Sequence, residues 1–290
     1  MRSVTHTEIT LITGIMVLIF AAVVLLQIPA RSQAFLYPLV RKATVAKINY
    51  ETRGLMTRET DHFIIKYNPV DIDVVDMVAE AAEAAYQPVT SALGYNPAPK
   101  TIVVMYHNKA ELRKAFGWSG DQSAMGVYWG GVIQLLSPHE WMKQGDTVAE
   151  FIHSGPMVHE FSHLVFDHVT NGNYPRWFTE GLAQYVEYKV NNYEWITANN
   201  RLDGQLFTME QLDGEFDELT NQALAYRQSL AAIRYIAEVH GEDNLHQVIN
   251  ELKAGRKIDK AIKNSLGLDY QAFDKAWREW AVRNMKNYEK

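Results

Sequence analysis

The sequence contains no cysteine, and this absence removes several kinds of site from consideration. A chain of 290 residues without a thiol has no disulfide scaffold, no thiolate zinc site and no cysteine nucleophile. The absence does not fix the compartment, because a chain without cysteine is compatible with either side of a membrane.

An excess of positive charge is also missing. The formal net charge is −6, and no basic stretch interleaved with aromatic residues occurs. We therefore expect no nucleic-acid partner. The hydrophobic fraction of 47% and the charged fraction of 21% are ordinary for a globular protein and sufficient for a sizeable core.

Charged residues are absent from residues 9–30, an apolar run long enough to cross a bilayer as a helix. This run predicts a single uncleaved anchor at residues 9–28, within an N-terminal unit of residues 1–30. A cleaved signal peptide is the alternative, but its apolar core is usually shorter. By the positive-inside rule, the positive charges after the run favour a cytoplasmic location for the domain that follows. The rule is weaker for large domains. The charges that follow the run are Arg31, Arg41, Lys42 and Lys47.

The remaining chain predicts a connector at residues 31–60 and one α+β domain at residues 61–290. Short β-branched and aromatic runs predict strands early in this domain, at residues 62–67, 100–106 and 124–136. Helical periodicity dominates afterwards and also occurs between the strands. The predicted helices lie at residues 71–94, 108–116, 156–170, 175–190, 220–241 and 270–286.

Two histidines and a glutamate stand together in the apolar stretch GPMVHEFSHLVF, residues 155–166. Apolar segments rarely carry such groups unless the groups have partners. On a helix, the spacing of His159 and His163 puts both imidazoles on one face, where they can bind one zinc ion. Glu160 is rotated aside and is the expected general base, as in the H-E-x-x-H arrangement of metallopeptidases. A satisfied protein core is the alternative explanation.

A catalytic zinc ion needs a third protein ligand and one open position. The histidine of the longer H-E-x-x-H-x-x-G-x-x-H motif is missing, because Phe166 and Val169 occupy the glycine and histidine positions. Glu180 is the preferred candidate, since its helix follows the motif helix after the short turn NGNYP. Three other residues remain open as alternatives: Asp167, His168 and Glu187.

The paired segments HEFSHLVF and YPRWFTEGLAQYVE resemble the gluzincin zinc peptidases, specifically the peptidase MA-like family. The resemblance runs from about residue 60 to the C-terminus and includes HFIIKY, MGVYWGGVIQLL and AYRQSLAAIRYI. It implies a small sheet followed by a mostly helical part. It also implies one Zn²⁺ per chain, with His159, His163 and Glu180 as ligands and Glu160 as general base. A membrane-attached or secreted bacterial protein is further implied, which favours a domain outside the cytoplasm.

Tyr226 is the candidate for a second catalytic residue, because a phenol can donate a hydrogen bond to a developing oxyanion. Its alternative is a core position, since Tyr226 shares a helical stripe with Leu230 and Ile233. The stretch AMGVYWGGVIQ offers either an ordinary strand or an edge on which an extended peptide adds by β-augmentation.

These features together predict a membrane-anchored, zinc-dependent metallopeptidase acting on a peptide or protein substrate. Two other functions fit the same sequence. One is hydrolysis of a non-peptide amide at the same site, and the other is a non-catalytic binding protein on a peptidase fold. The intact Glu160 argues against the binding protein, because a purely metal-binding role does not require that base.

Overall fold

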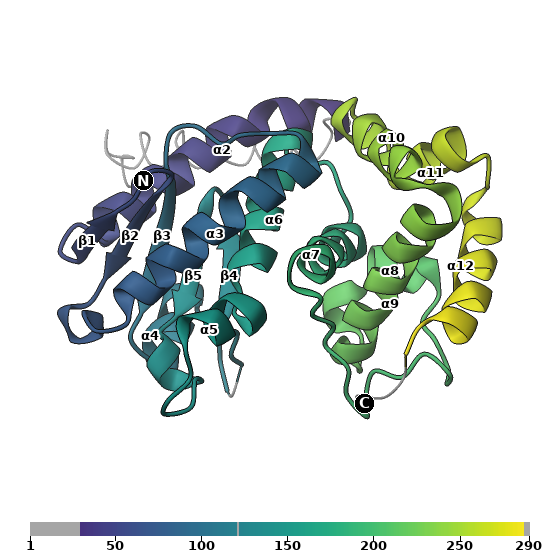
Figure 1. The fold of residues 1–290 in the computed structure, drawn as a ribbon. Coiled ribbons are helices and arrows are strands. Elements are labelled where there is room, and N and C mark those ends of the chain that lie inside the picture. Colours follow the sequence, from purple (N-terminus) through teal and green to yellow (C-terminus); the bar gives the residue numbers. More distant parts are fainter. Residues whose placement is uncertain (1–29, 121, 287–290) are drawn as a thin grey trace, which may run out of the picture.

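The computed structural model describes residues 30–120 and 122–286 (Figure 1). These residues form an α+β fold in which most of the sheet precedes a mostly helical part, as the sequence predicts. The predicted anchor at residues 9–28 lies outside the described residues. Within the described ranges, no helix is both long and apolar enough to cross a membrane.

The sheet has five strands in the order β1-β2-β3-β5-β4. Strands β2, β3 and β5 are parallel, whereas β1 and β4 are antiparallel edge strands. The turn between β4 and β5 lies at Gly130 and Gly131, whose φ values of 53° and 95° favour glycine. The strands are β1 (Met56–Glu59), β2 (Phe63–Tyr67), β3 (Thr101–Tyr106), β4 (Gly126–Trp129) and β5 (Val132–Leu136).

The six helices predicted by range are all present, and the described residues contain five further α-helices. A single π-helical turn, Ile236–His240, extends α9. Three 3₁₀ turns occupy Pro69–Asp71, Pro138–Glu140 and Phe216–Glu218. The α-helices are α2 (Ala30–Glu51), α3 (Val75–Leu93), α4 (Lys109–Phe116), α5 (Val148–Ser154), α6 (Met157–Thr170), α7 (Arg176–Asn191), α8 (Met209–Gly214), α9 (Gln222–Tyr235), α10 (Glu242–Lys253), α11 (Ile258–Leu266) and α12 (Tyr270–Asn284).

Alternation along β3 explains how helices cover both faces of the sheet. Val103 and Met105 belong to the large core shared with α3 and α6. Ile102 and Val104 face the other way and form a smaller core with Ile48 of α2. Residues 31–60, interpreted from the sequence as a connector, thus contain α2 and β1, which both pack on the domain.

Helices α6 and α7 meet where the sheet half of the molecule adjoins the helical half (Figure 1). Helix α6 ends at Asn171 and Gly172, both with positive φ, and α7 begins at Arg176 after a short loop. Gly181 of α7 allows a close approach to α9. A Cβ atom on Gly181 would lie 2.3 Å from the Ser229 carbonyl oxygen.

Candidate metal centre

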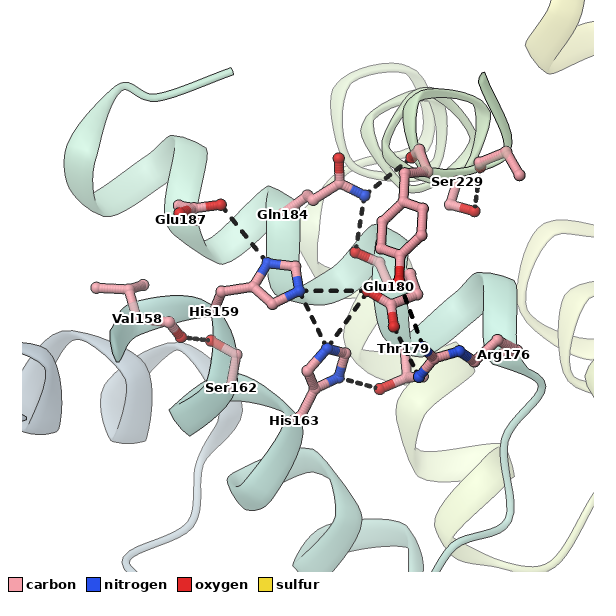
Figure 2. Close-up of polar contacts among 12 residues, drawn as sticks. Val158, His159, Ser162, His163, Arg176, Thr179, Glu180, Gln184, Glu187 and Ser229 are labelled. Atoms are coloured by element: carbon pink, nitrogen blue, oxygen red, sulfur yellow. Dashed lines mark hydrogen bonds and ion pairs between the residues drawn. The ribbon is translucent and has the colours of Figure 1, made fainter. Parts of the chain in front are cut away.

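Helix α6 places His159 and His163 one turn apart, with both rings directed towards α7 (Figure 2). Their Nε2 atoms are 3.1 Å apart. The His159 side chain retains 17% of its exposure and that of His163 retains 8%, so the pair is mostly withdrawn from solvent. Two imidazole nitrogens thus face one small volume between the two helices.

Glu180 of α7 supplies a carboxylate to the same volume. Its Oε2 atom lies 3.2 Å from His159 Nε2 and 3.4 Å from His163 Nε2. Bonds of ~2.0–2.1 Å around a tetrahedral zinc ion give ligand-to-ligand distances of about 3.3 Å. The three residues that the sequence singled out therefore fit one ion of this size, and the cluster could hold a metal.

Partners on the outer side of the cluster fix the direction of each group. The Nδ1 atom of His163 is 2.7 Å from the Thr179 hydroxyl, and that of His159 is 3.6 Å from a Glu187 oxygen. The second Glu180 oxygen pairs with Arg176 at 2.8 Å. Because such outer partners orient metal-binding histidines, both Nε2 atoms are held towards the centre.

The protonation equilibria of the cluster are strongly coupled. Burial opposes a charge on His159, but Glu180 and Glu187 outweigh it and raise the pKa of this imidazole well above its ordinary value. Burial favours a neutral Glu180, yet His163, His159 and Arg176 hold the pKa of that carboxyl well below its usual range. Because a metal binds neutral imidazole, a divalent cation would compete with the proton on His159.

Glu160 lies beside the two histidines in a cleft of about 390 Å³. Burial raises the pKa of its carboxyl, although His159 and His163 counteract this effect. Gly126 of β4 makes room for it, since a Cβ atom there would lie 2.7 Å from Glu160 Cγ. Glu160 thus lines the same cleft as His159 without belonging to the three-residue cluster.

Tyr226 of α9 lines the same cleft and is half-buried. Its hydroxyl oxygen accepts a hydrogen bond of 3.3 Å from Arg176 Nη2. The negative charge of Glu180, together with burial, raises the pKa of this phenol, so it stays protonated as a donor. Leu230 and Ile233 of the same stripe are buried in the core, whereas Tyr226 faces the cleft.

The other candidates for the third ligand have partners elsewhere. Asp167 forms an ion pair with Arg41 at 2.9 Å. His168 accepts from the same guanidinium at 3.0 Å through Nδ1. Glu187 contacts the outer nitrogen of His159 rather than the inner one. The structure therefore brings Glu180 to the Nε2 atoms of the two histidines. The three alternative ligands do not belong to this group.

The sequence analysis missed Arg176, Thr179 and Gly126, and it considered Glu187 only as a ligand. Arg176 precedes Glu180 by one helical turn and Glu187 follows it by two, so helical spacing contains a signal for both residues. Thr179 and Gly126 carry no such signal. Their importance depends on where α7 and β4 lie relative to α6.

The chain is similar to a known protein family, to a curated protein and to a solved structure. Residues 146–283 match the family model described as the Peptidase MA superfamily. The uncharacterized protein YhcO of Bacillus subtilis (strain 168) is 23% identical over 232 residues, covering 76% of this chain and 70% of that protein. The crystal structure of Legionella pneumophila aminopeptidase A in complex with aspartic acid is similar over 77% of this chain, with 15% identity and a TM-score of 0.49. That match spans 27% of the Legionella chain.

Proposed function

Residues 146–283 belong to the Peptidase MA superfamily, and from this premise we propose that the chain is a zinc-dependent metallopeptidase. One observation carries the proposal: His159 Nε2, His163 Nε2 and Glu180 Oε2 lie 3.1–3.4 Å from one another. The family match and a cluster that could bind a metal hold whichever metal binds; the choice of zinc is the proposal.

The donor set favours zinc over harder cations. Two imidazoles and one carboxylate match catalytic zinc sites, whereas magnesium and calcium prefer oxygen ligands. His159, His163 and Glu180 would hold the ion. When bound, zinc would polarise the scissile carbonyl and increase the acidity of a water molecule.

The chain's own groups would then handle the protons. Glu160, through a carboxylate oxygen, takes a proton from the attacking water and delivers it to the leaving amine. The Tyr226 hydroxyl donates to the developing oxyanion, and the nearby Arg176 keeps Glu180 ionised. Strand β4 is a sheet edge next to the cleft, which supports binding of an extended peptide along it.

The test uses the purified full-length chain, with zinc content and hydrolysis of a peptide library measured together. We expect about one zinc per chain, cleavage of peptides, and a zinc-replete but nearly inactive Glu160→Gln protein. Cleavage that persists in Glu160→Gln would overturn the mechanism. A chain that binds zinc yet cleaves only non-peptide amides, or nothing, would support one of the two other functions instead.

We also propose that residues 9–28 anchor the chain in the cell membrane with the domain outside the cytoplasm. The support is the uncharged apolar run in the sequence and the family resemblance. Protease added to intact cells should digest the domain together with a known surface protein. Survival of the domain while that surface protein is digested would place it on the cytoplasmic side.

A further inference from the structure

The segment that follows α7, residues 192–200, forms part of the cleft wall, and we refer to it as the strap. The chain turns at Asn192, whose φ is 53°. Tyr193 and Trp195 of the strap line the cleft next to Tyr226. The rings of Trp195 and Tyr226 meet edge to face at 6.3 Å between centroids. Two aromatic side chains of one short segment thus line the cleft that contains the candidate catalytic groups.

Glu194 stands between these two aromatic residues in the sequence, and its carboxylate pairs with two arginines of α9. Its two oxygens pair with Arg227 at 2.6 Å and with Arg234 at 2.9 Å. The Arg227 side chain is 1% exposed and also donates to the Lys286 carbonyl. Desolvating such an ion pair is costly, so it is weak evidence for stability by itself. It does fix where the strap crosses α9.

Two further hydrogen bonds lie on either side of Glu194, one at the end of α7 and one within the strap. Asn191 donates to the Ile152 carbonyl at 2.9 Å, which ties the end of α7 to α5. Asn200 donates to the Trp195 carbonyl at 2.8 Å. The Tyr193 ring packs edge to face against His153 at 6.0 Å. The aromatic wall is therefore preorganised by contacts that do not involve the three-residue metal cluster.

Two large apolar side chains of the cleft lining are exposed to solvent. Trp195 is 44% exposed, and Met125, another residue of the lining, is 40% exposed. Among the residues that the structure describes, none of those lining the cleft is a lysine or an arginine, whereas Glu160 and Glu187 are acidic. Burial of the tryptophan and methionine surface favours a large apolar ligand, and the two carboxylates disfavour an acidic one.

We propose that the strap forms a specificity pocket in which Trp195, Tyr193 and Met125 bind a large apolar, preferably aromatic, side chain of the peptide substrate. Glu194 is a positioning residue, since it reaches the cleft only through the strap that it holds. This inference rests on the proposed peptidase function and deepens it by naming the substrate class. A cleft of about 390 Å³ has room for such a side chain beside the candidate catalytic groups.

The test compares zinc-loaded full-length proteins on peptide pairs that differ only by phenylalanine or alanine at one position, with every position scanned in turn. Wild-type protein should prefer phenylalanine at one position. Trp195→Ala should lower kcat/KM for that peptide by about 10- to 100-fold, mainly through KM, and change the alanine peptide little. Tyr50→Ala is the matched control, because Tyr50 of α2 is an aromatic residue that is 67% exposed and lies outside the cleft lining.

Glu194→Gln tests positioning separately from packing. It keeps both aromatic rings but weakens the ion pairs with Arg227 and Arg234. The ratio of kcat/KM between the two peptides should fall several-fold, with kcat for the alanine peptide retained. An unchanged ratio in both Trp195→Ala and Glu194→Gln, or an equal loss for both peptides, would overturn the proposal.

Binding to the Glu160→Gln protein separates this proposal from the proposed function. Calorimetry should show tighter binding of the phenylalanine peptide, and Trp195→Ala in the same background should remove the difference. If no variant hydrolyses any peptide but this binding pattern appears, the peptidase function fails and the pocket stands. If wild-type protein hydrolyses peptides but the two peptides bind equally, the pocket fails and the peptidase function stands. If neither peptide binds, the pocket also fails.

Discussion

Two buried polar clusters share helix α6, one built on His159 and His163 and the other on Asp167 one turn further along. Each combines ionisable groups within an apolar environment, and each involves histidine and a carboxylate. In the Asp167 cluster, the carboxylate accepts from the hydroxyls of Tyr128 and Tyr174 at 2.6 and 2.9 Å. Arg41 of α2 adds an ion pair at 2.9 Å, so the chain itself supplies the cation.

The three-residue metal cluster is arranged differently. Its only guanidinium neighbour among the described residues, Arg176, binds the outer oxygen of Glu180 and leaves the inner oxygen facing the two imidazoles. Residue types alone do not separate the two clusters, since Asp167 and His168 were both plausible ligands. The two clusters differ in the source of the positive charge that compensates their carboxylates. Arg41 of the chain pairs with Asp167, whereas the inner oxygen of Glu180 and the two imidazoles form a group that could hold a metal ion.

The largest expected effect is a loss of catalysis from a substitution that changes no residue of either cluster. Glu160→Gln should lower kcat/KM for a peptide substrate by about 10²–10⁴-fold, because it removes the basic oxygen but keeps the size of the side chain. Zinc content and the free energy of unfolding should stay at wild-type values. Glu80→Gln, on an exposed position of α3, serves as the control and should leave the rate unchanged.

The next prediction compares the two clusters directly by replacing one carboxylate in each cluster with the corresponding amide. Glu180→Gln should weaken zinc affinity by more than about 100-fold, since a ligand matters more than an outer partner. Asp167→Asn should retain zinc but lower the free energy of unfolding by about 3–5 kcal/mol, because Arg41 loses its buried counter-charge. Chelator competition and urea unfolding measure the two quantities.

Loss of zinc affinity in Glu180→Gln only, together with loss of stability in Asp167→Asn, would distinguish a metal site from an ordinary polar core. Loss of zinc in both variants would show that Asp167 supports the metal cluster directly. Full zinc affinity in Glu180→Gln would show that Glu180 is not a ligand.

A smaller contrast concerns one tyrosine from each cluster. Tyr226→Phe should lower kcat by about 10²–10³-fold, as for other single oxyanion donors, with stability nearly unchanged. Tyr174→Phe removes a hydrogen bond to the buried Asp167 and should lower the free energy of unfolding by about 1.5–3 kcal/mol, with kcat unchanged. An unchanged kcat in Tyr226→Phe would assign that hydroxyl a structural role only.

The sequence predicted the metal cluster because its residues are close in the chain. Helical spacing relates His159 to His163, and a short loop delivers Glu180 on the next helix. Local periodicity likewise predicted β2, β3, the β4–β5 segment and six of the helices, whereas β1 and α2 lie in the stretch that was interpreted as a connector. Tyr226 was proposed because a phenol can donate to an oxyanion, but its place at the cleft depends on the packing of α9 on α7, which has no local signal.

The second cluster could not be predicted in this way. Arg41 reaches the Asp167 carbonyl across 126 positions of sequence, through the placement of α2 on the far face of the sheet. Basic residues among apolar ones around Arg41 favoured a connector, since a lone arginine is usually exposed. Its burial depends on Tyr128, Tyr174 and Asp167 meeting at one point, which is a property of the tertiary fold.

The smallest expected effect is the response of the Asp167 cluster to acid through His168. Burial, with Arg41 nearby, lowers the pKa of this imidazole from 6.5 to about 4. Between these two values the unfolded chain binds a proton that the folded chain does not, so stability is complete above pH 6.5 and falls as the pH drops towards 4. Because the ring is partly exposed, we expect a loss of about 1 kcal/mol at pH 5 relative to pH 7. Urea unfolding of the metal-free protein and of metal-free His168→Gln at both pH values isolates this contribution. An equal loss in both proteins would assign the acid sensitivity to other groups, whereas a smaller loss in His168→Gln would assign it to the His168 imidazole, which burial and Arg41 keep neutral in the folded protein.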